Sequence, residues 1–246
     1  MDDKSWPAVT AWRKQQREHL IAQRIALPPA EHQAWSAAIN AHLRAGFDCR
    51  DGAVVGFCWP FKNEFDARFV VRDFRANGAV AALPVVVAKA QPLQFRQWWP
   101  GAPMKAGVYG IPFPDATAVV LPDAAIVPMN GFDGQGYRLG YGGGYFDRTL
   151  AALAPQPIAI GIAFECARLP SITPQSHDIP MDFVVTEAGI QVAAAGGLEK
   201  IYGEECRRRV DRLREQRRRL TASAAANSSP VCYSAKGADC SGGNSA

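Results

Sequence analysis

The sequence predicts an α/β protein in which helices cover a largely parallel sheet. Three observations lead to this prediction. Short apolar runs alternate with helical patterns along the chain, a glycine-rich stretch follows one such run and precedes a helix, and hydrophobic residues make up 48% of the chain. Alternating strands and helices are typical of parallel sheets with helices packed on their faces. The apolar content is ample for a buried core.

Two helices are predicted at the start of the chain. Ser5 is a candidate N-cap and Pro7 lies in the first turn, so a helix is expected to run to about Ile25. Pro28–Pro29 end this helix. A second helix is expected to follow to about Leu43, because apolar residues four positions apart form one face of it.

Six apolar or alternating runs are predicted as strands. They are Ala53–Trp59, Ala79–Val87, Leu93–Trp98, Ala124–Met129, Ile158–Phe164 and Phe183–Thr186. An amphipathic pattern over Asp66–Ala76 predicts a helix between the first two strands, and another helix begins near Tyr145. The stretch Asn130–Gly144 reads as a glycine-rich loop. No internal repeat is present, so the alternation describes one α/β unit.

Composition narrows the classes of function. No run of about 18 apolar residues occurs, and Met1–Lys14 lacks the apolar region of a signal peptide, so we expect a cytoplasmic protein with no membrane partner. The 6 cysteines show no short paired spacing, which argues against a zinc cluster and gives no support to a disulfide framework. With only 4 histidines, a histidine-based metal site or a Ser-His-Asp triad is not expected.

The net charge of +4 is concentrated near the end of the chain. Residues 200–219 hold nine Lys or Arg and four acids, so the remainder is slightly acidic. Nucleic acid is therefore not an expected partner, except through 200–219. A solvated terminal helix or an amphipathic dimer contact explains that segment equally well. We expect a monomer or a weak dimer.

Three parts are predicted along the chain. Residues 1–198 form the domain, residues 199–221 form an arginine-rich helix, and residues 222–246 form a disordered tail. The tail is rich in Ala, Ser, Gly and Asn and has too little apolar surface to offset the entropy of ordering. Removing residues 200–246 is expected to leave the activity largely intact.

The glycine-rich stretch predicts an anion site. Residues 140–144 read Gly-Tyr-Gly-Gly-Gly, which lets several backbone N–H groups converge on one anion at the start of a helix. Arg138 and Arg148 flank the stretch as forked donors, and Asp147 supplies a hard oxygen ligand of the kind Mg²⁺ takes. A tight turn, with Asp147 as a helix-start residue, remains the alternative. Neither a P-loop nor a dinucleotide fingerprint is present.

The order of residues over Gly136–Arg148 resembles the signature GxRLGYGGGYYDR of the 5-formyltetrahydrofolate cyclo-ligase family, also called methenyltetrahydrofolate synthetases. Phe146 stands where a Tyr is common. Further segments of the chain are similar to family motifs in order and spacing: Arg13-x3-Arg17, Pro60-x3-Glu64-x-Asp66, Tyr109-Gly110-Ile111-Pro112, and His177-Asp178 followed by 182–187. The resemblance covers about residues 10–190. It implies a three-layer α/β/α fold resembling sugar-phosphate isomerases and CoA transferases.

The resemblance also implies the site and its ligands. ATP phosphates would be held by basic residues of the first helix and by the signature: Arg13, Lys14, Arg17, Arg138, Leu139, Gly140, Tyr141, Gly142, Gly143, Gly144, Tyr145 and Phe146. The reduced folate would contact Trp59, Glu64, Tyr109, Tyr141 and Tyr145. Mg²⁺ would be held by Asp147 and Asp178, and the catalytic residues would be Arg138, Asp147 and Arg148.

The implied reaction is an ATP- and Mg-dependent ring closure. 5-Formyltetrahydrofolate becomes 5,10-methenyltetrahydrofolate, and ADP and phosphate are released. Such phosphoryl transfer needs positioning and charge neutralisation rather than a protein nucleophile. Each residue has a plainer interpretation as well: Glu64 as a loop acid, Tyr109 as a packing residue, Asp178 as a turn acid, and Lys14 with Glu18 as a solvated face. A non-catalytic relative that binds a nucleotide or folate is the other alternative.

Overall fold

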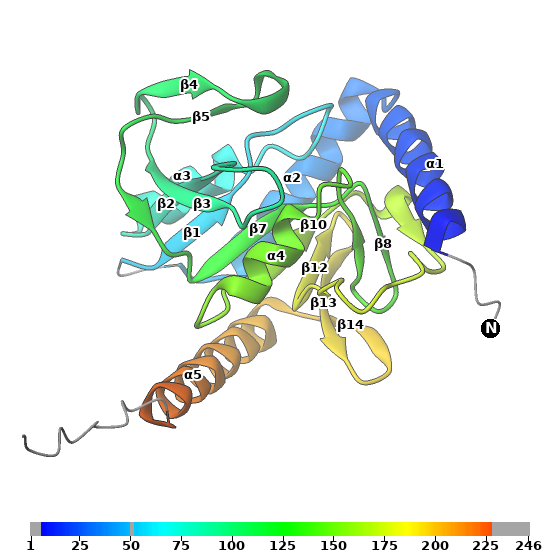
Figure 1. Ribbon diagram of the computed structural model, residues 1–246. Helices are drawn as coiled ribbons and strands as arrows, with labels where there is room; N and C mark the ends of the chain where they lie inside the picture. Colours follow the sequence, from blue (N-terminus) through cyan, green and yellow to red (C-terminus); the bar gives the residue numbers. More distant parts are fainter. Residues whose placement is uncertain (1–5, 50–51, 228–246) are drawn as a thin grey trace, which may run out of the picture.

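The computed structural model describes residues 6–49 and 52–227, apart from the side chains of Tyr109 and of residues 224–227. A nine-stranded sheet forms its centre, with the strand order β14-β13-β12-β10-β7-β1-β2-β3-β6 (Figure 1). Five neighbouring strands of this sheet are parallel: β12 (Phe183–Thr186), β10 (Ile158–Ile162), β7 (Ala124–Pro128), β1 (Val54–Phe57) and β2 (Val80–Val85). These strands coincide with apolar runs in the sequence, as predicted.

Antiparallel strands complete both edges of the sheet. On one side lie β3 (Gln94–Trp98) and β6 (Val119–Val120), and on the other β13 (Gly189–Ala194) and β14 (Gly197–Ile201). The hairpin of β13 and β14 was not predicted. A separate hairpin, β4 (Met104–Ala106) and β5 (Pro112–Pro114), lies apart from the large sheet in Figure 1, and the short helix η1 (Val108–Gly110) connects its strands.

Two helical layers cover the sheet, which confirms the α/β prediction. The face that carries Ile126, Ile160 and Val185 packs against α2 (Pro29–Gly46), α3 (Arg68–Ala76) and α5 (Gly203–Asn227). The face that carries Ala125 and Val127 packs against α1 (Trp6–Ile25) and α4 (Tyr145–Ala152). Side chains alternate between the two cores along β7 and β10, as the pleat of a strand buried on both faces requires.

The stretch predicted as one glycine-rich loop contains two short strands. β8 (Gly131–Asp133) and β9 (Arg138–Leu139) pair with each other, and β8 also pairs with β11 (Arg168–Leu169), which follows the short helix η2 (Glu165–Ala167). Asp133 closes the turn between β8 and β9 by accepting hydrogen bonds from the N–H groups of Gln135 and Tyr137. Only residues 140–144 therefore remain as the loop before α4.

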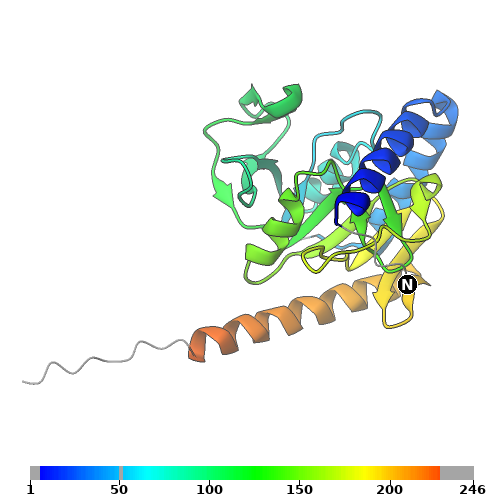
Figure 2. The same cartoon turned by 45° about the vertical axis from the view of Figure 1, so that its right-hand side comes forward.

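Helix α5 begins and ends later than predicted, and it packs against the core. It covers Gly203–Asn227, so residues 222–227 are helical, and β14 crosses the predicted boundary at residue 198. Cys206 and Val210 are buried, and Arg217 forms an ion pair of 2.7 Å with Asp182. The last turns of α5 project from the body (Figure 2). The predicted disorder of 228–246 and the Ser5 cap lie outside the described residues.

None of the helices in the described ranges is both long and apolar enough to span a bilayer.

Candidate active site

The candidate site lies where the parallel strands end. Glu64 follows β1, the glycine-rich loop follows β7 after the β8–β9 excursion, and Cys166 follows β10. Strand β1 is bonded to its sequence neighbour β2 on one side and to β7 on the other. The strand order therefore reverses between β1 and β7, and ligands of open α/β sheets bind outside the carboxyl ends of the strands at such a point.

The glycine-rich loop presents unused backbone donors. The N–H groups of residues 141–144 donate no hydrogen bond within the described part of the chain. Gly142 has φ +93°, and a Cβ there would lie 3.3 Å from the guanidinium carbon of Arg17. A side chain would strain the backbone and crowd Arg17. The glycine thus lets Arg17 lie directly against the loop.

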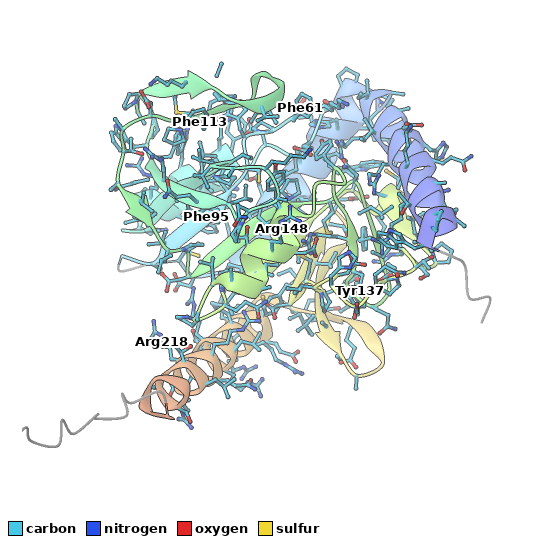
Figure 3. All side chains as sticks on the ribbon, viewed as in Figure 1. Phe61, Phe95, Phe113, Tyr137, Arg148 and Arg218 are labelled. Atoms are coloured by element: carbon cyan, nitrogen blue, oxygen red, sulfur yellow. The ribbon has the colours of Figure 1, made fainter. Side chains whose placement is uncertain are left out.

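The loop ends in the first turn of α4. Gly144 precedes the helix at φ +61°, a left-handed conformation that glycine adopts without strain. Arg148 turns back over the loop: its Nη2 donates to the carbonyl of Gly143, and its guanidinium lies 5.2 Å from the Tyr145 ring centroid. Its Nε is buried without a partner among the described residues. Figure 3 labels Arg148 on α4.

Two predicted loop residues face the protein interior. Leu139 is 1% exposed, so it can reach a nucleotide only through its backbone. Phe146 packs against the core on the α4 face of the sheet, and it does so with its ring, so the missing hydroxyl costs no contact there. If these two residues contact a nucleotide, as predicted, they would do so through their backbone atoms.

Arg13 and Arg17 reach the site from α1. Arg13 donates to both oxygens of Asp178, the shorter contact being 2.5 Å, and to the carbonyls of Ile172 and Thr173. Burial lowers the pKa of Arg17, and the nearby Arg13 lowers it further. The Nε of Arg17 is buried without a partner in the described ranges. A desolvated, partly unpartnered guanidinium is stabilised by an anion.

Arg138 and Asp147 form a buried ion pair within the site. Arg138 Nη2 donates to Asp147 Oδ1 at 3.0 Å, and Nη1 donates to the carbonyl of Ile179 at 2.7 Å. The backbone N–H of Ile179 donates to the same Oδ1 at 3.1 Å. Burial lowers the pKa of Arg138, although Asp147 and then Asp178 oppose that shift. The guanidinium of Arg138 thus interacts electrostatically with both predicted metal ligands, Asp147 and Asp178.

The two acids differ in their free capacity for a metal. Asp147 Oδ2 accepts no hydrogen bond from the described residues, and the side chain is 19% exposed. Asp178 is more committed, since Arg13 contacts both of its oxygens and the N–H of Gln175 donates to Oδ2 at 2.7 Å. Burial acts to raise the Asp178 pKa, but these hydrogen bonds outweigh burial and the net pKa is lowered.

A single magnesium ion fits this donor set. The described residues hold no group of three or more His, Cys, Asp or Glu side chains that could bind a metal. Magnesium needs only one or two carboxylates beside phosphate oxygens and waters. Asp147 supplies such a carboxylate with one oxygen uncommitted. The metal role of Asp178 stays a prediction.

A buried polar network lies between Glu64 and the loop. Tyr141 donates its hydroxyl to Glu64 Oε1 at 2.7 Å, and the N–H of Phe61 donates to Oε2 at 3.0 Å. Burial raises the Glu64 pKa, and the Tyr141 hydroxyl, Arg24 and the Phe61 N–H oppose this shift. Behind them lies a cavity of about 30 Å³ lined by Glu64, Arg24 and Cys58, which is the size of about one water.

Arg24 is the site residue that the sequence did not reveal. It is 7% exposed, and its guanidinium donates to the Lys62 carbonyl at 3.0 Å, to Asn130 Oδ1 at 3.0 Å and to the Tyr141 hydroxyl at 3.1 Å. It also lies 3.6 Å from Glu64 Oε1. One signal could have found it: Arg24 stands seven positions after Arg17, on the same face of the helix.

Two predicted residues form no hydrogen bond or ion pair with this arrangement in the described ranges. Lys14 is exposed and lies 4.0 Å from Glu18, in agreement with its plainer interpretation as a solvated face. Trp59 packs partly buried against the core, with the guanidinium of Arg68 4.4 Å from its ring. The side chain of Tyr109 lies outside the described residues. The folate role of Trp59 and Tyr109 stays a prediction.

Comparison with known proteins agrees with the fold and the motif. Residues 9–187 match the sequence model of the 5-formyltetrahydrofolate cyclo-ligase family. A 5-formyltetrahydrofolate cyclo-ligase of Haemophilus influenzae is 27% identical over 158 residues, which is 61% of this chain and 84% of the relative. One from Mycolicibacterium smegmatis is 27% identical over 183 residues, which is 71% of this chain and 93% of the relative.

Two solved structures are similar in fold. The 5,10-methenyltetrahydrofolate synthetase of Aquifex aeolicus has a TM-score of 0.65 at 25% identity, covering 77% of this chain and 96% of that one. A 5,10-methenyltetrahydrofolate synthetase from Mycoplasma pneumoniae has a TM-score of 0.56 at 22% identity, covering 71% and 98%. The second likeness concerns the fold alone.

Fold and site together define an α/β enzyme whose glycine-rich loop, flanked by arginines, lies at the carboxyl edge of a parallel sheet. The family match extends over more than half of the chain and includes that loop, Glu64 and Asp178. The chain belongs to the 5-formyltetrahydrofolate cyclo-ligase family, a family of ligases.

Proposed function

We propose that this protein closes the ring of 5-formyltetrahydrofolate to give 5,10-methenyltetrahydrofolate, using Mg-ATP and releasing ADP and phosphate. The observation that carries the proposal is the convergence of arginines on the glycine-rich loop. The loop offers free N–H groups, Arg17 lies against Gly142, and Arg148 folds over Gly143. An anion as highly charged as a triphosphate offsets the cost of burying these charges.

The chemistry explains why charge neutralisation suffices. The formyl group on N5 is an amide, whose carbon resists attack by N10. Transfer of the terminal phosphoryl group of ATP to the formyl oxygen makes that oxygen a good leaving group. N10 then bonds to the formyl carbon and loses its proton, the carbon–oxygen bond breaks, and phosphate departs with the former formyl oxygen. No protein nucleophile takes part in any of these steps.

Each cluster of residues has a role in this reaction. Arg13, Arg17, Arg138 and Arg148, together with the loop N–H groups, hold the phosphates. Bound Mg²⁺ would offset negative charge on the transferring phosphoryl group, and Asp147, with one free oxygen, would hold it. Glu64 and Tyr141 form the folate side, where the buried carboxylate accepts hydrogen bonds from the substrate in place of the Tyr141 hydroxyl.

The proposal is tested by mixing the full chain with Mg-ATP and 5-formyltetrahydrofolate. The methenyl product absorbs in the near ultraviolet, so its appearance reports turnover directly, and ADP should form in equal amount. Omission of either ATP or the divalent metal is the control. Absence of product under every metal and pH tried would overturn the proposal. Formation of ADP without product would point instead to a nucleotide-binding relative.

The cytoplasmic location and the monomeric or weakly dimeric state remain predictions. Nucleic-acid binding through 200–219 stays only an alternative, and several of the arginines there form ion pairs with acids of the same helix, as Arg208 does with Glu204.

A further inference from the structure

A second arginine-lined cavity lies at the opposite end of the parallel strands. Its walls are the residues just before β7, the segment between α4 and β10, and one side of α5, and its volume is about 120 Å³. The family match ends at residue 187, so α5 lies beyond it. In Figure 3, Arg218 of this helix lies well away from Arg148 of the candidate active site.

Arg217 fixes the helix at this cavity and has its charge balanced there. Its Nη1 donates to the carbonyls of Gln156 and Pro157, at 3.3 and 2.7 Å, and its Nη2 donates to Asp182 Oδ1 at 2.7 Å. Asp182 also accepts from the N–H of Ala159. These partners use the donors of Arg217, so this residue anchors α5 and is not the group that needs a ligand.

The two other lining arginines are poorly compensated. Arg214 and Arg218 stand four residues apart, on the same side of α5. Arg214 has a buried Nε without a partner among the described residues, and its nearest acid is Asp211 at 3.8 Å. Arg218 has no ion pair or hydrogen bond within the described ranges. Like charges at this spacing repel each other unless something negative lies between them.

The acids near the cavity balance only part of this charge. Among the described residues, Asp123 is the one lining acid and its Oδ2 accepts from the N–H of Val54 at 2.8 Å, so one carboxylate faces three lining arginines. Asp182 is taken by Arg217. The remaining lining is apolar or backbone, with Leu121, Leu153 and prolines. Arg214 is partly buried against this lining, with its side chain 23% exposed, and Arg218 is exposed at the cavity mouth, so an anion beside Arg214 is less screened than one in bulk water.

We propose that this cavity binds a phosphate-type oxyanion, held between the guanidinium groups of Arg214 and Arg218. Two forked donors on one helix face suit an oxyanion with several acceptor oxygens. The volume corresponds to about four waters, which admits a free phosphate or the phosphoryl end of a small metabolite. The site is separate from the active site and does not depend on the proposed reaction.

The experiment compares Arg218→Gln with Arg219→Gln in the full chain. Arg219 is the adjacent residue, is exposed and pairs with Glu215 at 2.7 Å, so its substitution changes the charge of α5 equally without touching the cavity. Both variants keep the active site unchanged. Any difference between them therefore reports the cavity alone. The measurements are calorimetric titration with inorganic phosphate and with glycerol phosphate, and diffraction from crystals soaked in tungstate.

We expect a tungstate peak beside Arg214 and Arg218 in the wild type and in Arg219→Gln, and none there in Arg218→Gln. The weaker class of phosphate binding in the titration should lose at least tenfold in affinity in Arg218→Gln only. Glycerol phosphate binding as well as inorganic phosphate would identify a metabolite phosphoryl group as an acceptable source. Equal losses in both variants, a peak that persists in Arg218→Gln as an adventitious ion only, or no binding in the wild type would each overturn the proposal.

Discussion

Replacing Arg24 by Met tests whether one buried guanidinium holds the two halves of the candidate site together. Arg24 is a residue of α1, whereas its partners lie after β1 and in the segment that follows β7. Met keeps much of the side-chain volume and removes every donor. The change leaves Glu64 buried, with its closest cation gone.

The expected loss follows from burial. The side chains of Arg24 and Glu64 are only 8% and 6% exposed, and removing one partner of such a buried pair costs about 3–5 kcal/mol. For a chain of this size, that lowers the melting temperature by about 6–20 °C. Adding Glu64→Gln removes the stranded charge. The double variant should therefore be less destabilised than the sum of the single ones, by about 0.5–3 kcal/mol.

Denaturant unfolding of the two single variants and the double variant measures this cycle. Arg44→Met is the matched control, because Arg44 pairs with Asp73 at a half-exposed position, with side chains 50% and 47% exposed. Its loss should stay below about 1 kcal/mol. If Arg24→Met cost no more than this control, or if Glu64→Gln gave no relief, the argument that Arg24 stabilises a buried carboxylate would be refuted.

Three further predictions concern the acids of the site and helix α5. Asp147→Asn should lower turnover by about a hundredfold and raise the Mg²⁺ requirement in a steady-state titration, while the control Asp73→Asn should change neither. Asp147→Asn should also lower the free energy of unfolding by about 1–3 kcal/mol in a thermal melt, because buried Arg138 loses its anionic partner. Removal of residues 200–246, which is expected from the sequence alone to leave the activity largely intact, should lower stability by about 3 kcal/mol or more in denaturant unfolding, because Asp182 is left buried without its cation. Burial raises the pKa of Glu64 in the folded state. The stability of the wild type relative to Glu64→Gln should therefore be greatest below about pH 4.3 and should fall as the pH rises through the raised pKa of the folded state. Parallel curves of melting temperature against pH for the two proteins over about pH 4–8 would contradict this.

The sequence sufficed for the parallel core because those strands are buried on both faces. Val54–Phe57 and Ile158–Ile162 are short continuous apolar runs, a pattern typical of strands buried on both faces, and their shortness argues against buried helices. The same reasoning failed for β8, whose Gly131, Phe132 and Asp133 carry no periodic signal. It also failed for the start of β13 at Gly189, where the chain turns back on itself at φ +138°. Short strands next to glycines depend on tertiary pairing for their existence.

The glycine-rich loop and its flanking arginines were predictable because their chemistry is local. Four glycines and two arginines within a few positions already place the donors around one point. Arg24 is different, because its contacts with Tyr141 and Asn130 bridge more than a hundred residues of sequence. The seven-residue spacing from Arg17 places Arg24 on the same helix face, but it does not encode these contacts. Only the docking of α1 across the sheet brings these groups together.

The pair formed by Arg13 and Asp178 shows what the structure adds to a residue-by-residue assignment. The family resemblance implies separate ligands for these residues, phosphate for the arginine and magnesium for the acid, yet they bind each other at 2.5 Å with side chains 9% exposed. A phosphate that draws Arg13 away leaves the Asp178 carboxylate buried and short of a cation, and a cation placed there relieves that cost. Magnesium bound at Asp178 would in turn free Arg13 for phosphate. Because coupling between two ligands is reciprocal, charge balance within this one pair would make the two predicted ligands, if both bind here, strengthen each other's binding.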